Sequence, residues 1–289
     1  MADEFFATAS SAFAGYNITD DQIVTLKACV DGASAPADAA KKMTVHPATS
    51  PTPLEMQQRL GGLWTLLNDT AVAVPSAQPA IISILQTIRT FPRVEAPRGE
   101  EEEFIDLDEG HVWRELTGWA NDWADNYNRH AARFTIESSQ DRERSARKAA
   151  WINANAYTAR LAATGDPALA SYGAALDRAS RAIFSALEFN RGGVEPVELE
   201  AAAELFKYAA SELYSRCRGE HHVSGSQAHK DEADKHEEGA RWCGEGGFSM
   251  EGWELWKRRW AELASLEGLS EQARAACGQA LQAMGKAET

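Results

Sequence analysis

The chain has 289 residues, of which 44% are hydrophobic and nine are tryptophan, so it is long enough and apolar enough for a globular protein with a substantial core. Its formal net charge is -14 and its isoelectric point is near 5.0. This charge argues against nucleic acid and anionic membrane surfaces as partners, because both favour clusters of Lys and Arg.

The beginning of the sequence carries no targeting pattern. Asp3 and Glu4 precede only a short apolar stretch, so we expect neither a signal peptide nor a membrane span, and the expected location is the cytoplasm. The cysteines are too few and too far apart for a disulfide framework. We therefore expect reduced thiols at Cys29, Cys217, Cys243 and Cys277.

A capping box begins the first well-marked helix. Thr19 is followed three residues later by Gln22, a pair that can satisfy the free amides of a first helical turn, and this predicts a helix to about Val30. Residues 33–52 are then rich in Pro, Ala, Ser and Thr. This composition indicates an exposed, Pro-rich connector.

A second capping box follows the connector. Thr52 and Glu55 enclose a proline at the first helical position, and they predict a helix with one apolar side up to Val74. A shorter apolar helix is expected to end before Pro92. The two segments are close in sequence, which favours a helical hairpin.

The middle of the chain keeps the helical period. Large apolar residues recur at alternating steps of three and four over residues 113–134, which predicts one long amphipathic helix. Further helices are expected over residues 141–163 and from Leu199 to about Cys217. No window alternates with period two, as a half-buried strand would.

Residues 219–247 are rich in His, Gly and charged side chains and poor in large apolar ones, which predicts a mobile polar loop. Its histidines, His222, His229 and His236, fit no zinc spacing, so we expect no metal site. The chain also lacks a glycine-rich phosphate loop of standard spacing, so we expect no nucleotide and no other cofactor.

Residues 248–263 contain the most complete helix signal. Ser249 can cap the first turn, and Trp253, Trp256 and Trp260 follow at helical spacing on one face. Such a stripe is typical of a helix that packs against its neighbours, although one indole could instead line a ligand pocket. Together these segments predict an all-α fold of about eight to ten helices in a single compact domain spanning residues 1–289.

Three blocks of the sequence also resemble a known family. They read W-R-E-L-T-G-W-A-N-D-W from Trp113, A-W-I-N-A-N-A-Y-T-A-R-L from Ala150, and F-S-M-E-G-W-E-L-W-K-R-R-W-A-E-L from Phe248. These blocks are similar to those of a family of uncharacterised proteins from filamentous fungi, catalogued as a domain of unknown function. The resemblance extends from about Leu60 to Met284. It implies an intracellular fungal protein, and it implies no particular activity.

Polar residues interrupt the second block, which otherwise looks buried. Asn153, Tyr157 and Arg160 fall on one helical face. A buried Asn or Arg is costly unless it is bonded, so each needs a partner in the fold or in a ligand. Two interpretations stay open: a polar network that fixes helix register, with Glu115 or Asp122 pairing with Arg160, and a ligand-binding face.

Two functions from different classes follow from these residues. The first is binding or conversion of an apolar small molecule in a Trp-rich pocket, without metal or nucleotide. The second is a protein-interaction or scaffold role without catalytic activity, in which the helices present a surface to a protein partner. This role predicts an exposed apolar patch, such as one near the N-terminal helix with Phe5, Phe6 and Phe13. For the first function, the predicted ligand-binding residues are Trp123, His130, Asn153, Tyr157, Arg160, Trp256 and Lys257. No catalytic residue is assigned, and His130 fits a bonded core histidine as well as a general base.

Overall fold

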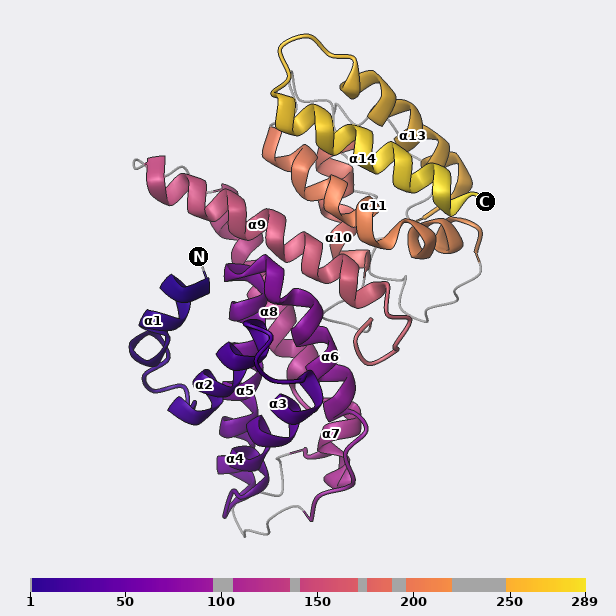
Figure 1. Cartoon of the computed structure of the whole chain (residues 1–289). Coiled ribbons are helices and arrows are strands. Elements are labelled where there is room, and N and C mark those ends of the chain that lie inside the picture. Colours follow the sequence, from indigo (N-terminus) through magenta and orange to yellow (C-terminus); the bar gives the residue numbers. More distant parts are fainter. Residues whose placement is uncertain (1, 96–105, 136–140, 171–175, 189–195, 220–247) are drawn as a thin grey trace. The chain divides into compact units, whose positions relative to one another are not determined.

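The computed structural model shows a chain built from helices (Figure 1). The residues that it describes are 2–95, 106–135, 141–170, 176–188, 196–219 and 248–289. None of these residues lies in a β-strand, so the all-α prediction is confirmed.

The chain divides into two compact units. Unit 1 comprises Met1–Tyr157 and Asp166–Ala174, and unit 2 comprises Thr158–Gly165 and Ala175–Thr289. One boundary between the units, from Tyr157 to Thr158, falls within the continuous helix Asp141–Ala162. The single domain expected from the sequence stays a prediction.

Unit 1 contains the helices of the first half of the chain and most of α9. Their bounds are α1 (Ala2–Ala12), α2 (Asp20–Val30), α3 (Pro36–Met43), α4 (Val45–Ala48), α5 (Pro53–Ala73), α6 (Gln78–Ile88), α7 (Val112–Glu115), α8 (Trp119–Thr135) and α9 (Asp141–Ala162). The predicted capping box at Thr19 is present, with the Gln22 side chain accepting the Thr19 amide at 3.0 Å, and Thr52 caps its helix through its hydroxyl. The Thr19 hydroxyl accepts the Gln22 amide at 3.2 Å, and the Thr52 hydroxyl accepts the Glu55 amide at 3.2 Å.

The predicted connector at residues 33–52 is wrong. This stretch contains α3 and α4, and Ala40 and Met43 are fully buried. Pro36 occupies the start of α3, where a missing amide costs nothing, and the alanines supply helix propensity. The Gln22 side chain also donates to the Met43 carbonyl at 2.9 Å. The proline content of this stretch predicted a loop, but Pro36 instead begins a packed helix.

The single long helix predicted over residues 113–134 is instead two helices, α7 and α8. The backbone at Leu116 is left-handed, with φ of 51°, and Gly118 has φ of 80°. The Trp64 indole donates to the carbonyl of Thr117 between them at 2.8 Å. A tertiary contact thus stabilises the break, and the apolar period continues across it.

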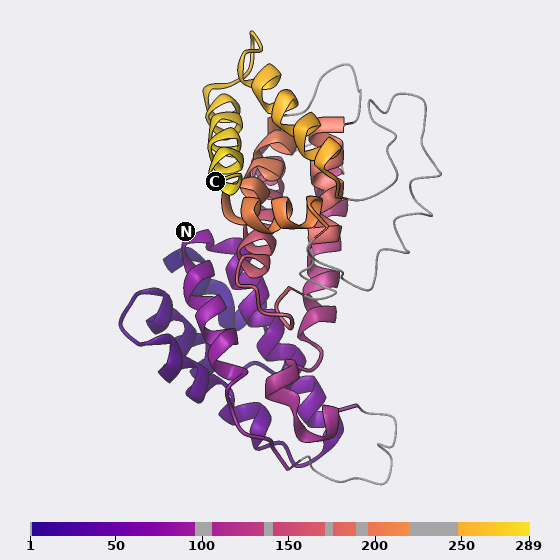
Figure 2. The same ribbon diagram turned by 90° about the vertical axis from the view of Figure 1, so that its right-hand side faces the viewer.

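Unit 2 contains α10 (Leu176–Ile183), the π-helical turn Phe184–Glu188, α11 (Pro196–Cys217), α13 (Met250–Ala264) and α14 (Glu271–Ala287). The last three helices pack against one another and lie side by side in both ribbon views (Figures 1 and 2). Ser249 caps α13 and Ser270 caps α14, as the sequence predicts for both serines. Ala209 interrupts α11 with a non-helical backbone, φ of -128° and ψ of 21°.

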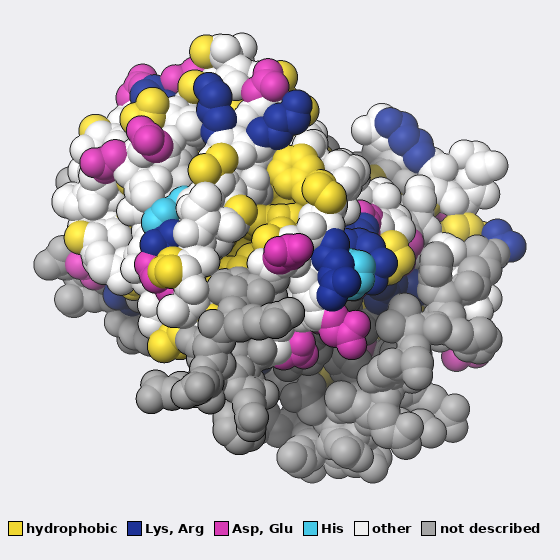
Figure 3. Space-filling view, turned by 90° about the horizontal axis from the view of Figure 1, so that it is seen from below, with side chains coloured by type: hydrophobic (Ala, Val, Ile, Leu, Met, Phe, Trp, Pro, Cys, Tyr) yellow, Lys and Arg dark blue, Asp and Glu magenta, His cyan; other side chains and the backbone are white. Residues whose placement is uncertain are grey.

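The described surface carries charges of both signs. On the face shown in Figure 3, Lys and Arg side chains lie close to Asp and Glu side chains, and some hydrophobic side chains lie near the middle. Within the described residues, no single helix is both long and apolar enough to cross a membrane; Pro53–Ala73 and Pro75–Ile88 meet both conditions only as a pair bent by 118°. The predicted loop at 219–247 lies outside the described residues, except for Gly219.

Candidate functional site

The residues predicted to bind a ligand are divided between the two units. Those of unit 1 are Trp123, His130, Asn153 and Tyr157. Those of unit 2 are Arg160, Trp256 and Lys257.

Trp123 and Tyr157 form an aromatic pair in the core of unit 1. Both are fully buried, and their rings meet edge to face with centroids 4.8 Å apart. The Trp123 indole N–H is buried without a hydrogen-bond partner among the described residues. His130 lies further along α8 and is half-buried, so it is not part of the closed core.

A buried polar network surrounds Asn68 of α5, and we call it the Asn68 network. The Asn68 amide donates to Asp122 at 2.8 Å, and its oxygen accepts the Trp119 indole N–H at 3.2 Å and the Tyr157 hydroxyl at 3.5 Å. Thr65 donates to the other oxygen of Asp122 at 3.0 Å. Burial raises the pKa of Asp122, although the bonds from Asn68 and Thr65 act in the opposite direction.

The asparagines of α9 also bond within unit 1. Asn153 donates to the Val72 carbonyl at 2.8 Å, and its own carbonyl accepts from Gln78 at 3.0 Å. Asn155 accepts the Tyr127 hydroxyl at 2.9 Å. These bonds fix α9 against its neighbours, as a register-fixing network would.

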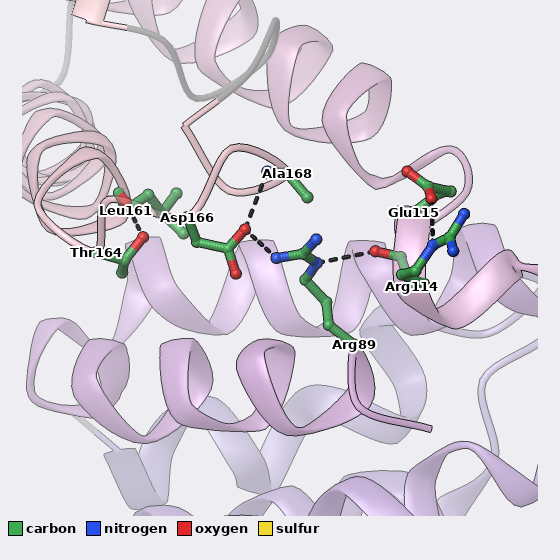
Figure 4. Close-up of polar contacts among 7 residues, drawn as sticks. All are labelled: Arg89, Arg114, Glu115, Leu161, Thr164, Asp166 and Ala168. Atoms are coloured by element: carbon green, nitrogen blue, oxygen red, sulfur yellow. Dashed lines mark hydrogen bonds and ion pairs between the residues drawn. The ribbon is translucent and has the colours of Figure 1, made fainter. Parts of the chain in front are cut away.

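Both carboxylates suggested as partners of Arg160 have partners of their own. Asp122 belongs to the Asn68 network, and Glu115 pairs with Arg114 at 2.6 Å. Figure 4 shows the ion pair that the sequence does not indicate: Arg89, at the end of α6, donates to the Arg114 carbonyl at 2.8 Å and pairs with Asp166. Arg89 thus joins three segments of unit 1.

In unit 2, the tryptophan stripe of α13 packs around one phenylalanine of α11. The Phe206 ring lies 6.1 Å from Trp253, 5.8 Å from Trp256 and 5.6 Å from Trp260, measured between ring centroids. All four side chains are buried. We call these four residues the Trp256 cluster, and they make the stripe a packed seam.

Lys257 has an internal partner. Its ammonium lies 2.7 and 2.6 Å from the two carboxylate oxygens of Glu288, which also accepts the Trp253 indole N–H at 2.8 Å. The Lys257 bond lowers the pKa of Glu288 and raises that of Lys257. Lys257 therefore holds α13 to the residue that follows α14.

A buried carboxyl borders the Trp256 cluster. Glu188, the last residue of the π-helical turn, is only 6% exposed and accepts the Trp256 indole N–H at 2.7 Å. Burial raises its pKa, and the Trp256 bond only partly opposes this effect. No sequence pattern described above predicts a role for Glu188. The available signal was an acidic residue directly after Leu187 in an apolar run.

We expect Glu188→Gln to stabilise the protein above the raised pKa. There, the folded state must bury an ionised carboxylate, whereas glutamine is neutral and its oxygen can still accept from Trp256. Because the folded state binds the proton more tightly, wild-type stability rises as pH falls towards the ordinary value of 4.5. The advantage of the variant should shrink over that range, as measured by urea unfolding at several pH values. A constant difference across pH would contradict the assignment to Glu188.

Arg160 lies against a different side chain of α11. Its guanidinium carbon is 3.7 Å from the centroid of the Tyr208 ring, and Lys207 Nζ is 4.8 Å from the same centroid. Lys207 pairs with Glu204 at 2.9 Å. Arg160 forms no ion pair with a carboxylate of the described residues, and its Nε is buried without a hydrogen-bond partner there.

Metal and thiol chemistry have little geometric support in the described residues. No three His, Cys, Asp or Glu side chains there are grouped to hold a metal ion. Cys29, Cys217 and Cys277 are free and buried, and burial raises the pKa of Cys217 to about 12, which disfavours the nucleophilic thiolate. Cys243 and the predicted histidine-rich loop lie outside the described residues.

Comparison with known proteins adds one finding. The model of a family described as "Protein of unknown function (DUF3632)" matches residues 64–260. The matched segment begins within α5 and ends within α13, so it contains the Asn68 network, Glu188 and Arg160. No curated protein and no solved structure matches the chain.

Proposed function

Because this chain belongs to the DUF3632 family of proteins of unknown function, we propose its function from its geometry: it binds a small, largely apolar molecule beside the Trp256 cluster, with Glu188 as the polar contact. The binding uses neither metal nor nucleotide. The cytoplasmic location and the fungal origin stay predictions.

The observation that supports this proposal is the buried Glu188 carboxyl bonded to the Trp256 indole. A carboxyl in such surroundings is costly, and a side chain that served packing alone would be apolar. Its raised pKa favours the protonated form, which can donate a hydrogen bond as well as accept one. It also ends a π-helical turn, a feature that is frequent at functional sites.

The surrounding side chains favour an apolar ligand. Phe248 packs on Trp256 with ring centroids 6.1 Å apart, and Phe248 is only half-buried. The aromatic surface therefore approaches solvent at this point. A ring-containing molecule could pack there while one hydroxyl or carbonyl reaches Glu188, which is the usual division of apolar and polar contacts in such sites.

Naphthol, an apolar ring system with one hydroxyl, tests this proposal as a probe. We expect saturable quenching of tryptophan fluorescence in the wild type, little change for Glu188→Gln, and binding weaker by about tenfold for Glu188→Leu, which loses one hydrogen bond. Glu254→Leu, at an exposed carboxylate of α13, is the matched control. Equal binding by wild type and Glu188→Leu would refute the proposal.

The second candidate function, binding of a protein partner, has a different basis. Four of the six large hydrophobic residues that are exposed in the described part of the chain precede the family match, namely Tyr16, Val24, Val45 and Leu54, and the other two are Met250 and Leu266. Phe6 and Phe13, expected in an exposed patch, are instead buried. A partner surface would thus use α2, α4 and the start of α5.

A further inference from the structure

The Arg160 side chain holds a positive charge that no described carboxylate neutralises. The whole chain has 43 acidic and 29 basic residues, so carboxylates are abundant. Arg160 nevertheless stacks on Tyr208, and its Nε is buried without a hydrogen-bond partner among the described residues. A buried donor without a partner costs free energy, and bound water or a ligand is the usual explanation.

The stacking also determines what Arg160 can bind. A guanidinium that lies over an aromatic ring uses its face for the ring, and its N–H groups point outward in its own plane. Two parallel N–H groups match the two oxygens of a carboxylate in the same plane. Tyr208 therefore holds the guanidinium ready for a planar oxyanion.

Lys207 places a second cation at the same ring. Its ammonium is 4.8 Å from the Tyr208 centroid, and only one carboxylate, that of Glu204, pairs with it among the described residues. The site thus contains two positive charges and one negative charge. An anion bound at Arg160 would remove the excess charge and reduce the repulsion between the two cations.

The backbone beside Tyr208 is also unusual. Ala209 interrupts the helical conformation of α11, although the helix has no glycine and its only proline is its first residue. A kink in a helix is normally caused by proline, by glycine or by a group inserted into the backbone hydrogen bonds. Irregular backbone is also frequent at binding sites. The interruption thus coincides with the ring that carries both cations.

We propose that Arg160, Lys207 and Tyr208 form a binding site for the carboxylate group of a small organic acid. This site does not depend on the function proposed for Glu188. Tyr208 and Phe206 are two residues apart on α11, so they point to different sides of the helix. The two proposals can therefore fail separately.

Isothermal titration calorimetry with benzoate, at constant ionic strength set with sodium chloride, tests the site. We expect saturable binding to the wild type and a loss of about 10- to 100-fold in affinity for Arg160→Met, which removes a charge-assisted hydrogen bond. Arg160→Lys should also bind more weakly, because it keeps the charge and loses the planar pair of donors. Arg258→Met, at an exposed arginine of α13, should bind as the wild type does.

Two further variants keep the test informative if Arg160→Met does not fold, and they distinguish the two proposed sites. Lys207→Met changes an exposed side chain, so it should fold even if Arg160→Met does not, and it should weaken benzoate binding several-fold. Glu188→Leu should bind benzoate normally, which separates this site from the Trp256 cluster. Equal affinity of the wild type and the Arg160 and Lys207 variants would overturn the proposal. Binding of inorganic phosphate without binding of benzoate would overturn the choice of a carboxylate.

Discussion

Asn68→Ala is expected to destabilise the protein by about 3 to 5 kcal/mol, because it leaves two partner groups unsatisfied at about 1 to 3 kcal/mol each. Asn68 is fully buried, and its one amide group bonds both Asp122 and the Trp119 indole. The alanine variant would leave an Asp122 oxygen and the indole N–H buried without those partners. Urea unfolding followed by circular dichroism measures the difference in the free energy of unfolding.

The control for this variant is Asn121→Ala, at an exposed asparagine of α8. Its effect should stay within about 0.5 kcal/mol, as for most surface substitutions. The double variant Asn68→Leu with Asp122→Leu should recover part of the loss, because it removes the acceptor together with its donor. A loss below about 1 kcal/mol for Asn68→Ala would show that the network contributes little to stability.

The sequence indicated the helices well where the signal was local. Caps such as Thr19 and Ser249 involve residues three apart, and the stripe of α13 has helical spacing, so both are visible in a short window. The break between α7 and α8 was missed because Trp64 of α5 stabilises it through Thr117. That contact joins residues 53 positions apart, which no local pattern records.

The candidate sites were less predictable for the same physical reason. A polar residue within an apolar helix signals that a partner is needed, but it does not say which one. Lys257 finds its partner in Glu288, 31 residues later, and Trp256 finds one in Glu188, 68 residues earlier. The sequence singles out Arg160 as a residue that needs a partner. Its aromatic neighbour Tyr208, rather than a carboxylate, appears only in the folded chain.

The second large effect is expected at Phe206, the centre of the Trp256 cluster. Phe206→Ala should destabilise the protein by about 3 to 5 kcal/mol, since it removes a buried ring and leaves a cavity. Three indole rings contact this phenylalanine, so none of them can fill the space without losing contacts of its own. Thermal and urea unfolding of the variant measure the loss.

Phe248→Ala is the matched control, because Phe248 also packs on Trp256 but is half-buried. It should cost clearly less than Phe206→Ala, since solvent can occupy part of the vacated space. The Phe206→Ala cavity should also bind benzene and recover part of the lost stability, as apolar cavities do. If the two variants were equally stable and benzene had no effect, the cluster would be loosely packed. A loosely packed cluster could not exclude water from Glu188. The burial that raises the pKa of Glu188 would then be lost, and with it the basis for a role of Glu188 in binding.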